Sequence, residues 1–252
     1  MSSPDVIDFQ GTFADFASCK SADVILLGVN VPHAQLQHMV AGLGKEWTFS
    51  RIGVFAIASR FEILNTSHYA LGLEVARPQS GESKFQVFYN EQLADRFGIS
   101  RREFDLPDPG HVLETQIRTP GGDVVIRLID LPSNPFRSRM NIANAAAASI
   151  ASLEKTHKLN SRPDVLIGDC NIPSGSASLN ILSRDLVAAE TIAQAGDIWP
   201  TWPRAMPVLR IDHAWVTPGS EVWSYRTFDG GISDHRGQSI HMSPPNATNP
   251  SN

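Results

Sequence analysis

The apolar positions of the chain fall mostly in short runs of β-branched and aromatic residues, and turn residues such as Gly, Pro and Asn separate the runs. This pattern is typical of strands rather than of long helices. It predicts strands at residues 24–29, 52–58, 70–76, 85–89, 112–118, 124–130, 165–168, 213–216, 221–226 and 238–241.

Apolar residues at helical spacing are fewer. They predict helices at residues 34–43, 139–156 and 176–186, and the Ala-rich stretch 141–148 gives the second of these the highest helix propensity in the chain. Because blocks of strands alternate with helices, we expect an α/β or α+β sandwich in which helices cover the faces of the sheets.

No internal repeat and no domain linker interrupts the 252 residues. We expect a single domain over residues 1–242, with residues 92–109 as a long surface insertion. Residues 243–252 are rich in Pro, Asn and Ser, which predicts a disordered tail.

The composition is that of an ordinary globular protein, with 42% hydrophobic and 19% charged residues. The formal net charge of −5 does not favour polyanions, so tight nonspecific DNA binding is not expected. Cys19 and Cys170 are too few for a disulfide framework or a four-thiolate zinc site, and we expect reduced, buried thiols. The sequence leaves the oligomeric state open.

The N-terminal residues lack a basic segment followed by an apolar run, so no export signal is recognisable. The apolar stretches, such as Val24–Leu27, are far shorter than the roughly 20 residues of a membrane-spanning helix. We therefore expect a cytoplasmic protein without a transmembrane segment.

The first polar pattern is GDCN, which follows a buried-type strand and carries Asp169 and Asn171. Residues two apart on an extended chain share a face, so the carboxylate and the amide would project together from the strand end. A carboxylate that accepts a proton from water, beside an amide that donates to an oxyanion, suits hydrolysis. A turn in which both side chains bond the backbone explains the segment equally well.

Two further polar patterns flank apolar strands near the C-terminus. Asp212 and His213 head one strand, and a Ser-Asp-His-Arg run with Asp234 and His235 precedes the last strand. If Asp212 bonds one ring nitrogen of His235, it fixes the tautomer and raises the basicity of the imidazole. Asp234 would then be free to hold a cation. Each Asp-His pair taken singly is explained equally by a surface turn.

GDCN, RIDHAWV and SDHR, in this order, closely resemble the three C-terminal signatures of the endonuclease/exonuclease/phosphatase family. Residues 21–27, 58–64 and 199–203 resemble family segments more loosely, and the resemblance covers about residues 14–242. It implies a four-layer α/β sandwich of two mainly antiparallel sheets flanked by helices. It also implies metal-assisted hydrolysis of a phosphate ester, most directly a phosphodiester, with Mg²⁺ (or Mn²⁺).

The resemblance also assigns roles to residues of the three motifs. Asp169 would activate or orient the attacking water, and Asn171 would help hold the scissile phosphate. His235, backed by Asp212, would bind the phosphate and stabilise its charge, with Asp234 near the metal. A hard divalent cation would offset the charge that gathers on the phosphoryl oxygens.

The chain departs from the family pattern at the metal site. Gly28 and Val29 stand where the family has its metal-binding Glu. Asn30 is the nearest oxygen-bearing side chain and could replace the Glu as a metal ligand, although an amide binds Mg²⁺ more weakly than a carboxylate. Asp130 stands where the family often has a His, and this carboxylate could bind metal and partly replace the Glu. The family begins with a strand that carries an Asn, and only residues 5–11, with Gln10 in that place, could match it. Either a start codon assigned too far downstream or a real loss of the strand would explain this difference.

Other candidate residues have two readings each. Asn134 and Arg137 are candidate substrate-binding residues, although Arg137 also fits a solvated helix start. Trp199 and Trp202 could stack on a base or sugar, or simply pack the loop. The histidines without paired carboxylates in the sequence are expected to be structural: His33, His38, His68, His111, His157 and His241.

Two functions follow from these patterns. The first is divalent-metal-dependent hydrolysis of a phosphate ester. The second is a degenerate family member that lacks the Glu and binds a phosphate-containing ligand or partner without turnover, in a manner insensitive to EDTA.

Overall fold

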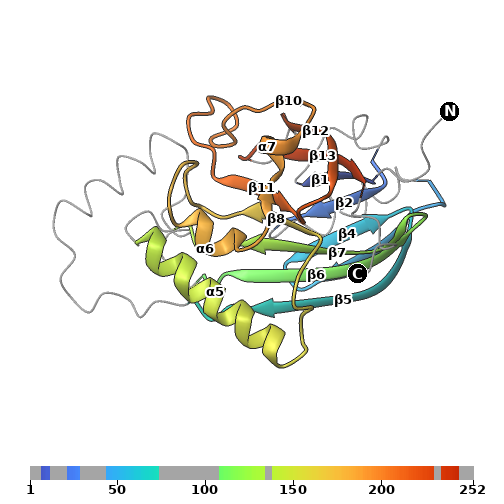
Figure 1. Cartoon of the computed structure of the whole chain (residues 1–252), viewed down its shortest axis with the longest axis horizontal. Coiled ribbons are helices and arrows are strands. Elements are labelled where there is room, and N and C mark those ends of the chain that lie inside the picture. Colours follow the sequence, from blue (N-terminus) through green and yellow to red (C-terminus); the bar gives the residue numbers. More distant parts are fainter. Residues whose placement is uncertain are drawn as a thin grey trace.

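The computed structural model describes residues 22–28, 44–73, 108–133, 138–229 and 234–243, together with the backbone of residues 7–11. Two β-sheets pack face to face, and helices cover the outer face of one of them (Figure 1). Most strand pairs in both sheets are antiparallel. The architecture is the α/β sandwich that the sequence predicts.

The larger sheet has seven strands, and its middle is formed by β13, β1 and β2. In spatial order its strands are β10 (Ala195–Asp197), β12 (Glu221–Phe228), β13 (Gly237–Ser243), β1 (Ile7–Gly11), β2 (Val24–Leu27), β4 (Phe55–Ser59) and β3 (Thr48–Ile52). The first strand is therefore present, because Ile7–Gly11 pairs with both β13 and β2.

The smaller sheet has six strands and carries the sequence motifs. Its spatial order is β5 (Glu62–Ala70), β6 (His111–Thr119), β7 (Gly122–Asp130), β8 (Val165–Asp169), β11 (Asp212–Val216) and β9 (Val187–Ala188). Alternate residues of its inner strands, such as Leu128 and Ile167, pack against Phe55 and Ile57 of the other sheet. This apolar layer is the core between the two sheets.

Helix α5 (Arg139–Lys155) covers the outer face of the six-stranded sheet. Ser138 caps its N-terminus by accepting a hydrogen bond from the amide of Asn141. Ile142, Ala146 and Ile150 bury one face of the helix against the sheet. Two short helices, α6 (Leu179–Ser183) and α7 (Ala189–Ile192), follow β8. Within the described residues, no helix is long and apolar enough to cross a membrane.

The structure corrects three predicted elements. Residues 52–58 form a hairpin rather than one strand, because Gly53 adopts φ +60° and turns the chain between β3 and β4. The strand predicted at 70–76 lies instead at Glu62–Ala70, an edge strand whose polar, half-exposed residues give little apolar signal. The helix predicted at 176–186 is only the five residues of α6.

Some predicted elements lie outside the described residues: the helix at 34–43, the strand at 85–89, most of the insertion at 92–109 and the tail at 244–252. The single-domain organisation stays a prediction. The remaining predicted strands are confirmed within one or two residues at most ends.

Candidate active site

A row of polar side chains crosses the inner face of the six-stranded sheet. His111 pairs with Asp130, Asp130 with Asp169, and Asp169 with Asp212, on the neighbouring strands β6, β7, β8 and β11. Directly paired residues point to the same face of a sheet. These four residues lie at the ends of their strands, on the face that packs against the other sheet. They form a polar row where the apolar core between the two sheets ends.

Close packing of strands β7 and β8 shapes the GDCN motif. Gly168 has φ +142°, and a Cβ at this position would overlap the backbone carbonyl of Ile129. Only glycine allows this approach of the two strands. It places Asp169 beside Asp130 at the ends of the parallel pair.

Asn171 holds the carboxylate of Asp169 from both its backbone and its side chain. Its amide N–H donates to Oδ1 of Asp169 at 2.7 Å, and its Nδ2 donates to Oδ2 at 3.0 Å. The same Nδ2 donates to the carbonyl of Leu131 at 2.7 Å, and the backbone of Asn171 has φ +50°. The turn bonds that the sequence allows are thus present, and they orient Asp169 toward the inner face.

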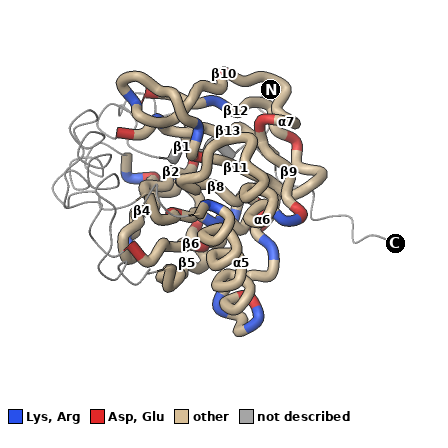
Figure 2. The backbone as a smooth tube through the Cα atoms, turned by 90° about the vertical axis from the view of Figure 1, so that its left-hand side faces the viewer, with Lys and Arg blue, Asp and Glu red and all other residues tan. Residues whose placement is uncertain are grey.

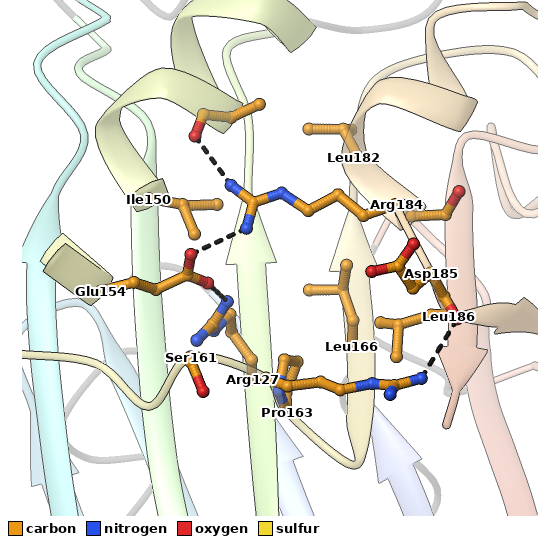
Figure 3. Close-up of a pocket in the computed structure, with 13 residues that line it drawn as sticks. Arg127, Ile150, Glu154, Ser161, Pro163, Leu166, Leu182, Arg184, Asp185 and Leu186 are labelled. Carbon is orange, nitrogen blue, oxygen red and sulfur yellow. Dashed lines mark hydrogen bonds and ion pairs between the residues drawn. The ribbon is translucent and has the colours of Figure 1, made fainter. Parts of the chain in front are cut away.

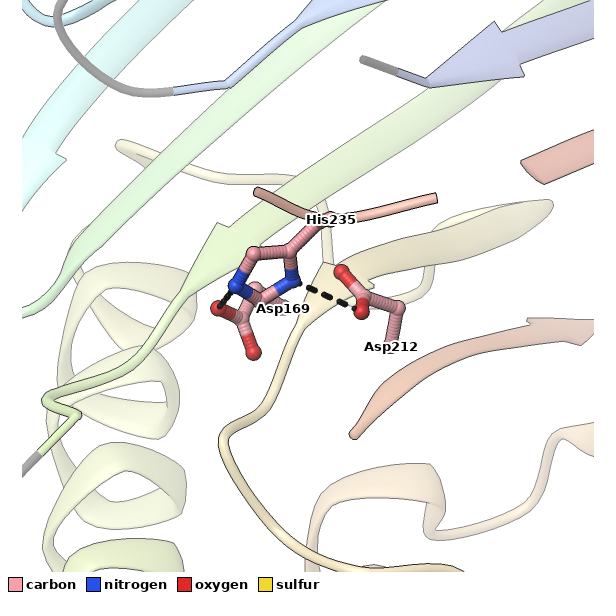
Figure 4. Close-up of side chains that lie close together, drawn as sticks. All are labelled: Asp169, Asp212 and His235. Atoms are coloured by element: carbon pink, nitrogen blue, oxygen red, sulfur yellow. Dashed lines mark hydrogen bonds and ion pairs between the residues drawn. The ribbon is translucent and has the colours of Figure 1, made fainter. Parts of the chain in front are cut away.

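The imidazole of His235 stands between two carboxylates (Figure 4). Its Nδ1 lies 2.9 Å from Oδ2 of Asp212, and its Nε2 lies 3.7 Å from Oδ2 of Asp169. Asp212 is only 3% exposed, at the first position of β11. The hydrogen bond between Asp212 and His235 that the motif analysis expects is therefore formed. His213 instead faces the other side, where its Nε2 donates to the carbonyl of Ile172.

The segment before β11 supports the site through backbone and side-chain bonds. The hydroxyl of Thr201, which is fully buried, accepts from the amides of Ile211 and Asp212. Nε1 of Trp202 donates to Oδ2 of Asp234 at 3.3 Å. Further backbone bonds join the segment to residues 234–236: Arg204 N to the Asp234 carbonyl, and Arg236 N to the Thr201 carbonyl. Trp202 thus packs the loop and positions Asp234.

Burial and mutual charge change the titration of the site. Burial, and then the charge of Asp212, raises the pKa of Asp169 to about 7, against the opposing effect of His235. Burial alone would lower the pKa of His235, but Asp212 and Asp169 raise it to about 10. Burial and the neighbouring Asp169 also raise the pKa of Asp130. His235 is therefore an imidazolium at neutral pH, surrounded by more carboxylates than it can neutralise.

The candidate metal-binding cluster consists of Asp169, Asp212 and His235. Their potential ligand atoms lie within 4.8 Å of one another. The two carboxylates can bind a cation directly, whereas His235 can do so only as the neutral ring. Asp130 and Asp234 add carboxylates beside the cluster, as the electrostatic effects on Asp130 and Asp169 show. Carboxylate oxygens are the ligands that Mg²⁺ and Mn²⁺ prefer.

Three predicted site residues, Asn30, Asn134 and Arg137, lie outside the described residues. Arg139 lies within them, and its guanidinium donates to the carbonyls of Pro132 and Ser133. The expectation that His111 is merely structural misses its place in the polar row. The sequence contains a signal for this position. The short turn between β6 and β7 pairs Thr119 with Gly122, and counting back along the two antiparallel strands from this pair places His111 opposite Asp130.

Comparison with known proteins places this geometry in a family. The sequence profile described as the endonuclease/exonuclease/phosphatase family matches residues 20–235. The chain therefore belongs to the endonuclease/exonuclease/phosphatase family. A search of curated protein sequences found no significant match.

Solved structures with the same fold share little sequence with the chain. A family protein from Bacteroides thetaiotaomicron is 13% identical, with a TM-score of 0.65 over 96% of this chain and 98% of that chain. A mannosyl-6-phosphatase from B. thetaiotaomicron VPI-5482 is 13% identical, with a TM-score of 0.65 over 94% and 99% of the two chains. TDP2 of D. rerio, complexed with a single-stranded DNA product, is 13% identical, with a TM-score of 0.59 over 94% and 99%.

Proposed function

We propose that the protein hydrolyses a phosphate ester, most directly a phosphodiester, with the help of a divalent cation. The observation that carries the proposal is the position of His235, whose imidazolium bridges Asp212 and Asp169 at the end of the polar row. A fixed positive group beside a held carboxylate is what hydrolysis of a phosphate ester requires.

The residues of the site divide the chemistry among them. Asp169, held by Asn171, would orient a water molecule and accept its proton. His235, held in place and kept protonated by Asp212, would donate from Nε2 to an oxygen of the phosphate and offset the charge that develops there. Since both nitrogens of His235 now face carboxylates, substrate would replace Asp169 as the partner of Nε2.

A hard divalent cation fits the charges of the site. Asp130, Asp169, Asp212 and Asp234 lie around a single imidazolium, and burial with mutual repulsion raises the pKa of Asp130 and Asp169. A bound cation would offset this repulsion and favour the ionised carboxylates. Asp130 and Asp169, on neighbouring strands, together with Asp234, are the residues that would hold Mg²⁺ or Mn²⁺. The cation would stabilise charge on the phosphoryl oxygens and lower the pKa of bound water.

A second function is a family member that binds a phosphate-containing ligand without turnover. One observation favours it: β2 ends at Leu27, and the next residue is Gly28, where no side chain reaches toward the site. The carboxylate that the family places near this point is absent from the sequence. Binding of the ligand would then be insensitive to EDTA.

Surface chemistry favours a small or apolar ester over a long polyanion. Lys and Arg are scattered among acidic residues along the described chain in Figure 2, and the net charge is −5. The segment next to Trp202, by contrast, exposes large apolar side chains, namely Ile198, Trp199, Met206, Val208 and Leu209. An aromatic or apolar substituent of the ester would find contacts there.

The test is hydrolysis of bis-p-nitrophenyl phosphate with Mg²⁺, with Mn²⁺ and with EDTA. We expect metal-dependent turnover that Asp169→Asn abolishes. Asp123→Asn is the matched control, because Asp123 is an exposed carboxylate at the opposite end of β7 from Asp130. Absence of turnover with every metal, together with phosphate binding that survives EDTA, would establish the second function instead.

A further inference from the structure

His111 is the member of the polar row that the proposed chemistry leaves unused. It is the first residue of β6, and it shares the inner face with Leu113 and its partner Asp130. It lies two strands from Asp169, which corresponds to about 10 Å at the usual spacing of neighbouring strands. His111 thus marks the end of the row away from His235.

A second imidazole holds the ring of His111 in place. Nδ1 of His111 lies 3.2 Å from Nε2 of His68 on β5, and the two rings stack at 5.2 Å with 28° between their planes. Phe55, from the opposite sheet, meets both rings edge-on. A Cβ at Gly53 would overlap the His68 ring, so the backbone of that turn closes the remaining side.

Only Nε2 of His111 is left to interact with a ligand, because Nδ1 is engaged by His68. Among the described residues, none forms a hydrogen bond with this nitrogen. The carboxylate of Asp108 acts on His111, and Asp130 is the residue paired with His111 across the strand. Burial lowers the pKa of both His68 and His111. When Nε2 of His68 donates to Nδ1 of His111, the proton of His111 is on its Nε2, which makes this nitrogen a hydrogen-bond donor.

The opposite sheet carries a glycine near these rings. Gly28 follows Leu27, which pairs with Ala56, so Gly28 lies across from Phe55. Among the described residues, no heavy atom lies within 4 Å of the position that a Cβ would take at Gly28. The described part of the opposite sheet therefore places no side chain at Gly28, across from the end of the row that carries His111.

The geometry points to His111 as a further substrate-binding residue, which donates from Nε2 to an acceptor oxygen on the organic group of the phosphate ester, with His68 as its positioning residue. This inference rests on the proposed function and narrows its substrate class. Since one phosphate cannot reach both His235 and a residue two strands beyond Asp169, the preferred ester carries a hydroxyl or a second phosphate on its organic group. A sugar-containing diester meets this requirement, whereas a simple alkyl ester does not.

The test compares two chromogenic diesters with the same leaving group. The thymidine group of thymidine 5′-p-nitrophenyl phosphate carries acceptor oxygens, and the methyl group that replaces it in methyl p-nitrophenyl phosphate carries none. We expect His111→Ala to lower the ratio of kcat/KM for the thymidine ester to kcat/KM for the methyl ester by about tenfold, the effect of one lost hydrogen bond. His111→Gln, which keeps a neutral donor, should restore most of the ratio.

His68→Ala should lower the same ratio by a smaller factor, and His68→Gln should restore it, because an amide can again donate to Nδ1 of His111. His157→Asn is the matched control, since His157 is exposed and far along the chain from the row, at φ +54°, which Asn tolerates. Thermal unfolding of each variant checks that it folds. An unchanged ratio in a folded His111→Ala protein would overturn the inference while leaving hydrolysis itself intact.

A binding measurement separates the inference from the proposed function. In protein labelled with ¹⁵N-histidine, the Nε2 signal of His111 should shift when the thymidine ester is added to the inactive Asp169→Asn variant, and it should stay in place with the methyl ester. If the wild-type protein hydrolyses neither ester, a selective shift still supports the role of His111. Equal responses to both esters, or none, would exclude it.

Discussion

Nδ1 of His235 lies 2.9 Å from Oδ2 of Asp212, and this hydrogen bond joins the two sheets at the site. Asp212 begins β11 of the six-stranded sheet, whereas His235 precedes β13 of the seven-stranded sheet. The geometry of the candidate site therefore depends on how the sheets pack, and each partner can be tested by a change that leaves the packing in place.

Asp212→Asn keeps the shape of this contact and removes its charge. The pKa of His235, about 10 in the wild-type protein, should fall, because Asp212 is the strongest of the groups that raise it. We expect kcat on bis-p-nitrophenyl phosphate to fall by about 10²–10⁴, as for other carboxylates that orient a histidine. NMR titration of the His235 ring, alongside the rate, checks both effects. A full drop in kcat with an unchanged histidine pKa would contradict this account of Asp212.

Divalent cations should stabilise the folded protein if the carboxylates bind them. At a hundredfold excess over Kd, Mg²⁺ or Mn²⁺ would raise Tm by about 5–10 °C, since ligand bound only to the native state stabilises it by mass action. Asp130→Asn should reduce this shift, and Asp123→Asn on the same strand should not. Scanning calorimetry with and without EDTA measures it. Equal shifts in both variants would exclude Asp130 from the metal site.

Gly168→Ala tests the close approach of β7 and β8. The added Cβ would overlap the carbonyl of Ile129, and φ +142° is itself strained for alanine. We expect a loss of about 3 kcal/mol or more in the free energy of unfolding, measured with urea. Gly175→Ala is the control, because Gly175 has φ +83° but open space around it. It should cost only the conformational term of about 1 kcal/mol, and an equal loss in both variants would rule out the clash.

A buried ion-pair network stabilises the outer face of the six-stranded sheet. Arg127, 3% exposed, bonds Glu114 and Glu154, and Glu154 also bonds Arg184 at the rim of a pocket of about 100 Å³ (Figure 3). Arg127→Met would leave Glu114 buried without a positively charged partner, although Asn160 still donates to its Oε1, and we expect the free energy of unfolding to fall by about 3–5 kcal/mol.

The control substitution for Arg127→Met lies on the neighbouring strand β6. Arg118→Met removes an arginine that bonds Glu62 and Asp123 in exposed pairs, and it should cost at most about 1 kcal/mol. Replacing Glu114 by Gln together with Arg127→Met should recover much of the loss, because no uncompensated charge then remains. Urea unfolding at pH 7 measures all three variants, and a small effect of Arg127→Met alone would contradict the argument.

The His68 and His111 pair should make stability depend on pH. Burial lowers the pKa of both rings below the ordinary value of 6.5, so between these values the unfolded chain binds more protons than the folded one. Their contribution is complete above pH 6.5 and is lost as pH falls through the folded-state pKa values. In urea unfolding between pH 5 and 8, the free energy of unfolding should therefore change less with pH in His68→Gln than in the wild type. An unchanged slope would mean that His68 titrates normally.

The sequence by itself determined the strands with strong apolar character and the positions of the catalytic motifs at their ends. Runs such as Val165–Asp169 and Asp212–Val216 are buried on both faces, so their apolar pattern is dense and their boundaries are clear. The polar residues that follow or begin these runs were recognisable as candidates for the same reason.

Only the tertiary structure decided which strand ends meet. The edge strand Glu62–Ala70 was not predicted, because its half-exposed polar residues carry little hydrophobic signal. For the same reason the sequence did not indicate that His68, on this strand, is the partner of His111. Sheet register set His111, Asp130, Asp169 and Asp212 in one row, and packing of the second sheet brought His235 between two carboxylates. Register and sheet packing are long-range properties, and the local pattern of a chain does not contain them.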